Sequence, residues 1–271
     1  MKALVINLAK AVDRMEFQIK QLNSMGVEFE RLSAISADDL DEDLYQQYYS
    51  TWERPLRKAE VACFFSHKNA WEKVIKYDSP MLIIEDDAYI SPILPCVLKG
   101  LENITDIDYV TLEIRGRKKI IAKKPKYEFC AISLIRLYQD RTGAAGYVLW
   151  PSGAKKLIKR FNIGNMALAD AFINLTYSLN MYQVEPAILI QHDQCKYYGL
   201  VPVFKTSSSV SSILREPVPA TGYIFYRFKR LIGQFKLGCR HLSFMLSSTK
   251  RHLLLSTYFE KTIVVQKKID K

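Results

Sequence analysis

Long apolar runs are missing from this chain of 271 residues. A membrane-spanning helix needs about 20 consecutive, mainly apolar residues, and no window of the sequence reaches that length. The N-terminal stretch M-K-A-L-V-I-N-L-A-K also lacks the long apolar core and the small-residue cleavage site of a signal peptide. We therefore expect a protein that is soluble or that, at most, lies on a membrane surface.

Cysteine pairs with a recognisable spacing are also missing. The five cysteines form no C-x-x-C pair and no His/Cys cluster with the spacing of zinc ligands. An odd and dispersed set of this kind is typical of buried, reduced thiols in a cytosolic protein. This expectation covers Cys63, Cys96, Cys130, Cys195 and Cys239.

The motifs of three large enzyme classes are absent. There is no G-x-x-x-x-G-K-[ST], and no G-x-G-x-x-G follows a strand-like segment. Neither a P-loop nor a dinucleotide-binding fold is therefore supported. The G-x-S-x-G elbow of serine hydrolases is absent as well.

What is present is an alternation of strand-like and helix-like segments over the first two-thirds of the chain. Continuous apolar or alternating runs predict strands, and apolar residues at three- and four-residue spacing predict helices. Strands are expected at 3–8, 29–35, 81–84, 108–114, 142–150 and 183–191, with a hairpin within 115–138. Helices are expected at 14–25 with Asp13 as the cap, at 36–45, at 59–77, from Ser91-Pro92, from Pro151-Ser152 and at 167–179. This order predicts an α/β protein whose mostly parallel sheet is flanked by helices.

Three consecutive carboxylates follow the strand-like run in M-L-I-I-E-D-D-A-Y-I (81–90). In open α/β sheets, ligands bind outside the carboxyl ends of the strands. Alternation along an extended segment puts Glu85 and Asp87 on one face and Asp86 on the other, and a divalent cation would offset their repulsion. A solvated turn with capping acids before Ser91-Pro92 explains the same residues, so both interpretations stay open at this point.

Several short segments, taken in their order along the chain, resemble those of glycosyltransferase family 25, which includes bacterial lipopolysaccharide galactosyltransferases and glucosyltransferases. They are V-I-N-L-A-K-A-V-D-R (5–14), F-E-R-L-S-A-I (29–35), A-E-V-A-C-F-F-S-H-K-N-A-W (59–71), I-I-E-D-D-A (83–88), T-G-A-A-G-Y-V-L-W-P-S-G-A (142–154), A-D-A-F (169–172) and V-E-P-A-I-L-I-Q (184–191). Each segment is weak alone, but their ordered combination is specific. Ala59 and Ala62 replace two glycines of the family pattern, and residues 115–140 match nothing in it.

The resemblance implies a GT-A-type, Rossmann-like fold and an inverting transfer from a UDP-sugar. It implies that Mn²⁺ or Mg²⁺ is held on the diphosphate by Glu85 and Asp87. His192 is a further candidate metal ligand, with a surface-loop histidine as the alternative. Inversion also needs a general base, and Asp170 is the candidate because desolvation by its apolar neighbours would raise its pKa. A helix N-cap is the alternative for Asp170.

The remaining candidates are expected to contact the nucleotide or the donor sugar. Arg14 could form paired hydrogen bonds to a phosphate or contact the uracil, and an ordinary surface arginine is the alternative. His67 lies on a strongly apolar predicted helix, where a core role is the alternative. Glu113 ends another predicted strand and either binds a sugar hydroxyl or pairs with Arg115 or Arg117. The complete set of predicted donor contacts is Asn7, Arg14, Ala34, Ile35, Glu60, Ser66, His67, Glu85, Asp86 and Gln191.

The positive charge of the chain is concentrated at its C-terminus. Residues 222–271 contain eleven Lys/Arg and two acids, and so carry +9 of the formal net charge of +11. Aromatic and basic residues alternate at helical spacing in 222–246, which favours binding to an anionic membrane surface. A helix packed on the catalytic core is the alternative, and no nucleic-acid-binding module accompanies the basic residues. We expect a catalytic domain at 1–213, a serine-rich linker at 205–212 and a basic amphipathic helical region at 214–271.

The favoured function is metal-dependent transfer of a hexose from a UDP-hexose to a lipid-linked lipooligosaccharide or lipopolysaccharide core. Galactose is the first expectation and glucose the second. Such an enzyme would be cytoplasmic and peripheral at the inner face of a bacterial membrane. A sugar nucleotidyltransferase, which would release pyrophosphate, and a non-catalytic peripheral membrane protein are the alternatives.

Overall fold

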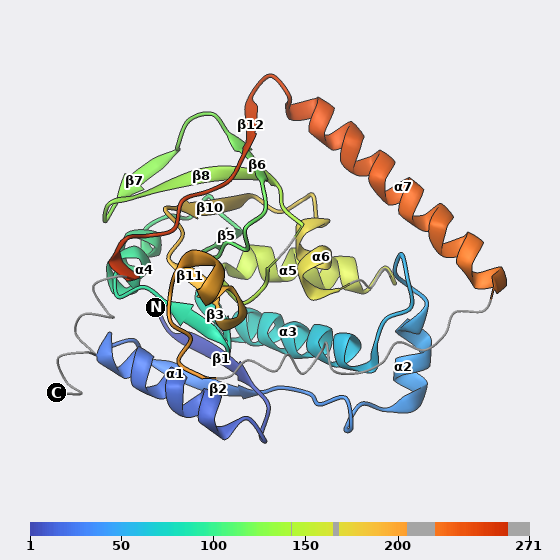
Figure 1. Ribbon diagram of the computed structural model, residues 1–271, viewed down its shortest axis with the longest axis horizontal. Coiled ribbons are helices and arrows are strands. Elements are labelled where there is room, and N and C mark those ends of the chain that lie inside the picture. The colour runs from blue at the N-terminus through green and yellow to red at the C-terminus, as the bar shows by residue number, and fades with distance from the viewer. Residues whose placement is uncertain (142, 165–167, 205–219, 260–271) are drawn as a thin grey trace.

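The computed structural model describes residues 1–141, 143–164, 168–204 and 220–259, and it has a mixed α/β architecture (Figure 1). Its large sheet has the strand order β12-β6-β8-β10-β5-β9-β3-β1-β2, with β7 paired to β8, and β4 and β11 form a separate pair. The strands are β1 (Ala3–Asn7), β2 (Phe29–Ser33), β3 (Met81–Glu85), β4 (Ala88–Ile90), β5 (Tyr109–Thr111), β6 (Lys119–Ala122), β7 (Tyr127–Phe129), β8 (Ile132–Gln139), β9 (Gly146–Leu149), β10 (Met181–Glu185), β11 (Leu189–Gln191) and β12 (Ser248–Arg251). The α/β class predicted from the sequence is confirmed.

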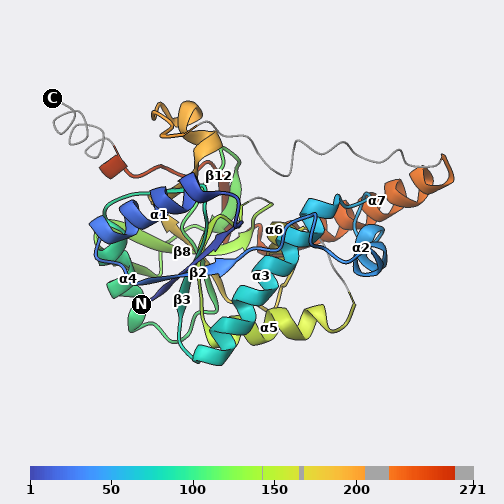
Figure 2. The same cartoon turned by 90° about the horizontal axis from the view of Figure 1, so that it is seen from below.

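Helices cover both faces of the sheet (Figure 2). Helices α1 and α4 lie on one face, and α3, α5 and α6 lie on the other. The helices are α1 (Val12–Ser24), α2 (Glu42–Tyr49), α3 (Lys58–Tyr77), α4 (Leu94–Glu102), α5 (Pro151–Phe161), α6 (Ala169–Asn174), the 3₁₀ helix η1 (His192–Tyr198) and α7 (Ala220–Phe244).

Strand β1 shows why its sequence is a continuous apolar run. Successive side chains of a strand point to opposite faces. Leu4 and Ile6 therefore pack into the core beneath α3, whereas Ala3 and Val5 pack into the core beneath α1 and α4. A strand that is buried on both faces has no position for a polar residue until it ends.

The sheet is mixed. Strands β2, β1 and β3 are parallel neighbours, and β5 is parallel to β10. Strand β9 runs antiparallel between β3 and β5, and the strands beyond β10 are also antiparallel. Residues 119–139 contribute β6 and the β7–β8 hairpin, in agreement with the hairpin predicted there. The parallel ends of β1, β2 and β3 put their last residues at one edge of the sheet.

Several predicted element boundaries are wrong, each for a local reason. Helix α1 begins after Ala11, so Asp13 lies inside its first turn and does not cap it. The acidic segment 36–45 becomes helical only at Glu42, because Asp41 is the N-cap and accepts a hydrogen bond from the backbone of Leu44. The predicted strand 183–191 is two strands in different sheets, β10 and β11, separated at the cis peptide before Pro186.

The prediction of five buried, reduced cysteines is wrong. Cys96 on α4 and Cys130 at the start of the β7–β8 turn are joined in a disulfide. Cys130 has a positive φ of 51°, which belongs to this tight turn and gave no signal in the sequence. Cys63, Cys195 and Cys239 are free thiols, and Cys239 is exposed.

The C-terminal region combines a peripheral helix with a strand of the main sheet. Helix α7 runs along one edge of the molecule (Figure 1), and β12 then pairs antiparallel with β6. Phe259 is buried further along the chain. The linker 205–212 and the predicted boundary at 213/214 lie outside the described residues. Among the described helices, none combines the length and the apolar character that a membrane span requires.

Candidate active site

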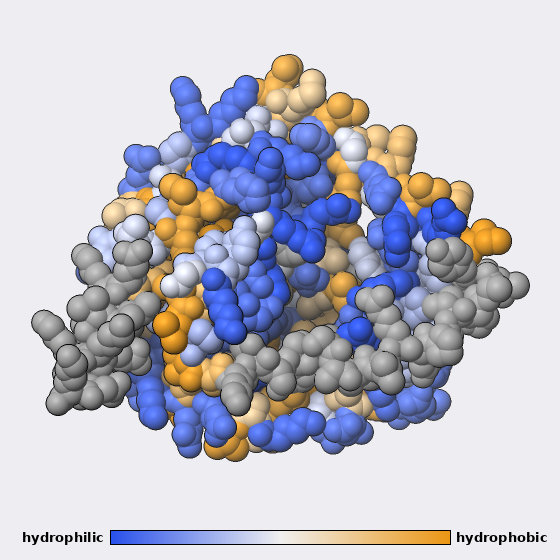
Figure 3. Space-filling model, viewed as in Figure 1, coloured by the Kyte–Doolittle hydropathy of each residue, from blue (hydrophilic) through white to orange (hydrophobic). Residues whose placement is uncertain are grey.

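A cavity of about 920 Å³ opens at the carboxyl ends of β1, β2 and β3. In the space-filling view the corresponding face is hollowed near its centre and is mainly hydrophilic around the hollow (Figure 3). Most of the residues predicted to form the site line this one cavity. They are Arg14, Ala34, Ile35, Glu60, Ser66, His67, Glu85, Asp86, Asp87, Asp170 and Gln191.

The three consecutive carboxylates at the end of β3 point in different directions. Asp86 is buried, and it accepts a hydrogen bond of 2.8 Å from Asn7 and forms an ion pair of 3.1 Å with Arg14. Glu85 and Asp87 instead face the amide of Gln191, at 3.2 and 3.5 Å respectively. The alternation expected of an extended chain is therefore present, and it pairs Glu85 with Asp87.

The charges of this pair are poorly compensated. Burial, together with the neighbouring charges of Glu85 and Asp86, raises the pKa of Asp87 to about 7. Burial also acts to raise the pKa of Glu85, but the hydrogen bond and charge of His67, the charge of Arg115 and the hydrogen bond from Gln191 together outweigh burial and lower the pKa. A carboxylate held next to a second, half-buried carboxylate is a site at which a cation binds favourably. Carboxylates are also the ligand type that Mg²⁺ and Mn²⁺ prefer, so Glu85 and Asp87 fit the divalent ion implied for this site.

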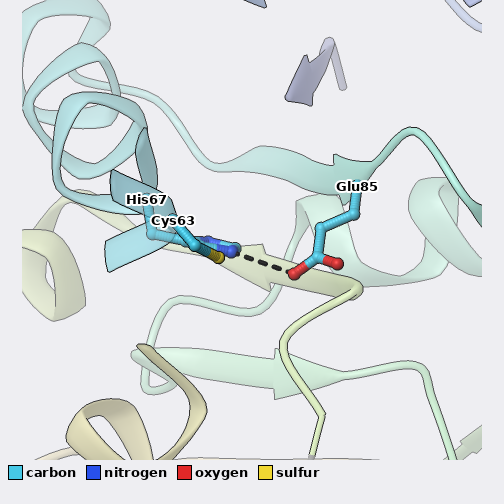
Figure 4. Close-up of side chains that lie close together, drawn as sticks. All are labelled: Cys63, His67 and Glu85. Atoms are coloured by element: carbon cyan, nitrogen blue, oxygen red, sulfur yellow. Dashed lines mark hydrogen bonds and ion pairs between the residues drawn. The ribbon is translucent and has the colours of Figure 1, made fainter. Parts of the chain in front are cut away.

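A second group of candidate metal ligands shares Glu85. Among the described residues, Cys63, His67 and Glu85 have ligand atoms within 4.8 Å of one another (Figure 4). A thiol ligates metal as the thiolate, and burial raises the pKa of Cys63 well above its ordinary value. The His67 Nε2 atom is also already hydrogen-bonded to Glu85, at 3.2 Å. The carboxylate pair is therefore the better cation site.

Ser66 and His67 on α3 are tied to the protein itself. The Ser66 hydroxyl donates to the carbonyl of Ala62 and accepts from the backbone N–H of Ile35, both at 2.9 Å. Ser66 thus holds the end of β2 against α3. Ala34 and Ile35 line the cavity at this end of β2. The Nδ1 atom of His67 lies 3.0 Å from the Tyr147 hydroxyl, deep in the core.

Glu60 lines the cavity with a carboxylate that is already saturated. Arg54 donates two hydrogen bonds of 2.7 Å to it, and the backbone N–H of Arg57 adds a third at 2.9 Å. This arrangement starts α3 after Arg57 and orients the Arg54 guanidinium. A bidentate, charge-assisted pair of this kind is strong and geometrically specific.

Asp170 lies in the first turn of α6 and lines the same cavity. The helix N-cap is Leu168, so the alternative interpretation of Asp170 as an N-cap is wrong. Its Oδ1 accepts a hydrogen bond of 2.7 Å from the backbone N–H of Ala171. Burial nevertheless raises the pKa of Asp170 above its ordinary value, as a general base requires.

Asn7 and His192 do not line the cavity. Asn7 is buried and holds the Asp86 carboxylate from behind. The His192 ring stacks on Phe204 with centroids 3.8 Å apart, and its Nδ1 lies 3.0 Å from the Asp87 carbonyl oxygen. His192 therefore supports the backbone of Asp87, and its role as a metal ligand stays a prediction.

Two cavity residues, Arg115 and Arg117, were missed as ligand contacts by the sequence analysis. Arg115 pairs with Asp193 at 2.5 Å. Both arginines come from the segment 115–140 that matched no family pattern, and the only signal was its run of basic residues. Glu113, by contrast, is fully buried and accepts hydrogen bonds from the backbone N–H groups of Ala145 and Gly146. Its predicted contact with a sugar hydroxyl and its predicted pairing with surface arginines are both wrong, because no face of its carboxyl reaches the solvent.

Comparison with known proteins gives a family assignment. The sequence model described as Glycosyltransferase family 25 (LPS biosynthesis protein) matches residues 1–173. Human procollagen galactosyltransferase 2 is 26% identical over 189 residues, which cover 64% of this chain but only 30% of the human protein. The lipooligosaccharide biosynthesis protein lic2B of Haemophilus influenzae is 25% identical over 202 residues, or 70% of this chain and 76% of that protein.

A weaker likeness is found among solved structures. A Drosophila β-1,4-galactosyltransferase 7 mutant in complex with manganese, UDP-Gal and xylobiose covers 81% of each chain, with 9% identity and a TM-score of 0.37. A TM-score this low supports no inference about the present chain. The family match extends over more than half of the sequence and includes the strand end with its three carboxylates, so the chain belongs to glycosyltransferase family 25.

Proposed function

We propose that this protein is a metal-dependent, inverting glycosyltransferase that transfers a hexose from a UDP-sugar to a lipooligosaccharide or lipopolysaccharide core. Galactose is the first choice of sugar and glucose the second. The observation that carries the proposal is the Glu85–Asp87 pair, half-buried beside Gln191 in a cavity that Asp170 also lines. Family membership and the names of the two relatives, a galactosyltransferase and a lipooligosaccharide biosynthesis protein, support it.

Glu85 and Asp87 would hold Mn²⁺ or Mg²⁺, and Gln191 would fix their orientation through its amide N–H. The ion would offset the negative charge that develops on the diphosphate leaving group. His67 keeps the Glu85 carboxylate in place at 3.2 Å. Asp86 is not a ligand in this proposal, since Asn7 and Arg14 already occupy its carboxylate.

The donor would lie along the ends of β1 and β2. The Arg14 guanidinium lines the cavity at the diphosphate end, and the backbone around Ala34 and Ile35 would flank the uracil. Arg115 and Arg117, which follow β5, add positive charge to the same cavity. Arginine recognises phosphate through its planar set of N–H donors.

Asp170 would accept the proton of the acceptor hydroxyl as that oxygen attacks the anomeric carbon. The C–O bond to the diphosphate breaks in the same displacement, which inverts the anomeric configuration. Burial prepares Asp170 for this step, because a carboxylate with a raised pKa is a stronger base. Asp170 lies away from the β3 end in the sequence but lines the same cavity, so the proposed base and the proposed cation site would share one volume.

The acceptor in this proposal is a lipid-linked oligosaccharide at the inner face of a bacterial cytoplasmic membrane. The protein would act there as a peripheral protein whose basic C-terminal region meets the anionic lipid. Nucleic acid is not expected as a partner.

The test is an assay of UDP release with UDP-galactose or UDP-glucose, a truncated lipooligosaccharide acceptor and either Mn²⁺ or EDTA. We expect UDP release that requires both acceptor and Mn²⁺ and that is faster with one of the two donors. Mass spectrometry would show one added hexose, and the anomeric proton signal of the product would report inversion. Pyrophosphate release from UTP and a sugar 1-phosphate would support the nucleotidyltransferase alternative. No UDP release from any UDP-hexose would overturn the proposal.

A further inference from the structure

Helix α7 presents its apolar side chains to the solvent. Ile224, Phe228, Leu231, Phe235 and Leu242 are 73%, 63%, 63%, 73% and 69% exposed. Their spacing of three, four and seven residues places them on one side of the helix. We call these five residues the outer stripe. In Figure 3 the corresponding edge of the molecule carries a band of hydrophobic side chains along α7.

The opposite side of α7 faces the protein and carries both polar and apolar residues. Lys229 donates to the carbonyl of Ser50, and Arg240 donates to the carbonyl of Tyr138, both at 2.8 Å. The Arg240 guanidinium also lies 4.1 Å from the ring centroid of Tyr177. Phe244, stacked on Tyr138, adds an apolar contact at the C-terminal end. The outer stripe therefore faces the solvent, whereas the apolar side of a surface helix usually faces the protein.

Cations border the outer stripe on both sides. At about 100° per residue, Arg227 lies about 70° round the helix from the centre of the stripe, Arg230 lies further round on the same side at about 130°, and Lys236 lies about 110° away on the other side. The helix contains five Lys/Arg and no acid. Its N-terminal end projects beyond the body of the molecule (Figure 2), which leaves the stripe accessible to a flat surface.

The charges select one occupant for this face. A second copy of the chain would bring two rows of Lys/Arg together with no acid on either helix to offset them. A nucleic acid would match the cations but would leave the outer stripe in water. An anionic lipid bilayer satisfies both features, because headgroups pair with the cations while the apolar side chains enter the acyl region.

We propose that α7 is an interfacial helix that lies in the plane of an anionic bilayer, with the outer stripe inserted and Arg227, Arg230 and Lys236 at the headgroups. The helix is not a membrane span. The proposal deepens the membrane association of the proposed function by naming the surface that makes it. It does not depend on sugar transfer, because binding is measured without donor or acceptor.

The experiment is co-sedimentation of the full chain with vesicles of phosphatidylcholine alone or mixed with phosphatidylglycerol. We expect binding to the mixed vesicles that weakens as salt is added. The triple variant Phe228→Ser/Leu231→Ser/Phe235→Ser should reduce the partition coefficient by at least about tenfold, because burial of each large apolar side chain contributes to transfer. Val12→Ser/Ile163→Ser/Val201→Ser is the matched control, since these residues are equally exposed but lie elsewhere, and it should bind as the wild type does. Arg230→Gln/Lys236→Gln should remove the preference for phosphatidylglycerol.

A second measurement keeps the test independent of the triple variant. In Phe228→Trp, brominated lipid should quench the fluorescence of the added tryptophan. The quenching should exceed that of the wild type, whose fluorescence comes from Trp52, Trp71 and Trp150. Equal vesicle binding by the triple variant and the wild type would overturn the proposal. A dimer of the wild type that becomes monomeric in the triple variant, without vesicle binding, would assign the stripe to a second copy instead. Transfer to a soluble oligosaccharide should be unchanged in the triple variant, so loss of catalysis and loss of membrane binding are separate outcomes.

Discussion

The Nε2 atom of His67 lies 3.2 Å from Oε1 of Glu85 and holds that carboxylate at the end of β3. The contact continues into the core, because Nδ1 of His67 lies 3.0 Å from the Tyr147 hydroxyl and the Trp71 Nε1–H donates to the same hydroxyl. Since Trp71 is only a donor, the hydroxyl proton of Tyr147 is free to go to Nδ1, and Nε2–H then donates to Glu85. The buried chain thus fixes the histidine tautomer that suits an ionised Glu85.

Removing the hydroxyl in the middle of this chain should destabilise the fold. Tyr147→Phe leaves the Trp71 Nε1–H and the His67 Nδ1 without partners in the core, which should lower the free energy of unfolding by about 1–3 kcal/mol. Urea denaturation measures this change. Tyr48→Phe is the control, because the Tyr48 ring packs on Phe65 and its hydroxyl makes no hydrogen bond to a described residue. Equal stability of Tyr147→Phe and the wild type would contradict the proposed chain.

Asp87 should decide the metal dependence of nucleotide binding. Asp87→Asn removes one of two half-buried carboxylates, so Mn²⁺ would lose a charged ligand and we expect a loss of metal-dependent UDP affinity on the order of tenfold or more. Calorimetric titration with UDP in the presence of Mn²⁺ or EDTA measures it. Asp78→Asn, at the exposed C-cap of α3, should bind as the wild type does. Unchanged Mn²⁺-dependent binding by Asp87→Asn would remove the metal assignment.

Substitution of Asp170 should lower the rate of sugar transfer without weakening UDP binding. In Asp170→Asn the amide oxygen can still accept from the Ala171 N–H, so the fold and the UDP affinity should be retained. Loss of the base should lower kcat by about 10²–10⁴-fold. Single-turnover transfer with a saturating UDP-hexose measures the step. If Asp170→Asn turns over at the wild-type rate, another group is the base.

Local sequence signals predicted the parts of the site that follow a strand directly. The apolar run before Glu85 is buried on both faces of the sheet, so charged residues could occur only after the run ends. The alternation of side chains along the strand then separated Asp86 from Glu85 and Asp87. The order of the family-like segments then predicted that Asp170 belongs to the same site, and Asp170 lines the same cavity. These inferences worked because each depended on residues adjacent in sequence or on an ordered set of segments.

The failures concern contacts between distant segments. The Asn7–Asp86 hydrogen bond joins residues 79 apart, and no local pattern distinguishes it from a contact with a ligand. His192 follows β11 as expected, but Phe204 and the Asp87 carbonyl determine where its ring lies. The basic composition of the C-terminal region predicted an amphipathic helix, and α7 is one. The sequence did not predict that the chain after α7 forms β12 beside β6, because these two strands lie more than 100 residues apart in the sequence.

The role of the Glu113 side chain also could not be predicted from the sequence. From the sequence it is a carboxylate after a strand, in the same position as Glu85. In the fold its Oε2 accepts from the Ala145 N–H at 2.6 Å and from the Gly146 N–H at 3.2 Å, while Oε1 has no hydrogen-bond partner. The Ala145 carbonyl in turn accepts from the N–H of Glu85. Glu113 therefore supports the backbone behind the site and does not enter it.

Glu113 should make the stability of the protein depend on pH. Burial raises its pKa from 4.5 to about 8, with the charge of Lys119 opposing the rise. Between these values the folded state keeps a proton that the unfolded state has released, so the free energy of unfolding should fall as the pH rises through this window, by at most about 1.4 kcal/mol per pH unit. Glu113→Gln removes this ionisation, and its stability relative to the wild type should rise between about pH 5 and about pH 8. Urea denaturation of both proteins at the two pH values measures the difference, and the exposed Glu128→Gln serves as the control. A constant difference between Glu113→Gln and the wild type would show that Glu113 is ionised in the folded state, with Lys119 as the cation that makes this possible.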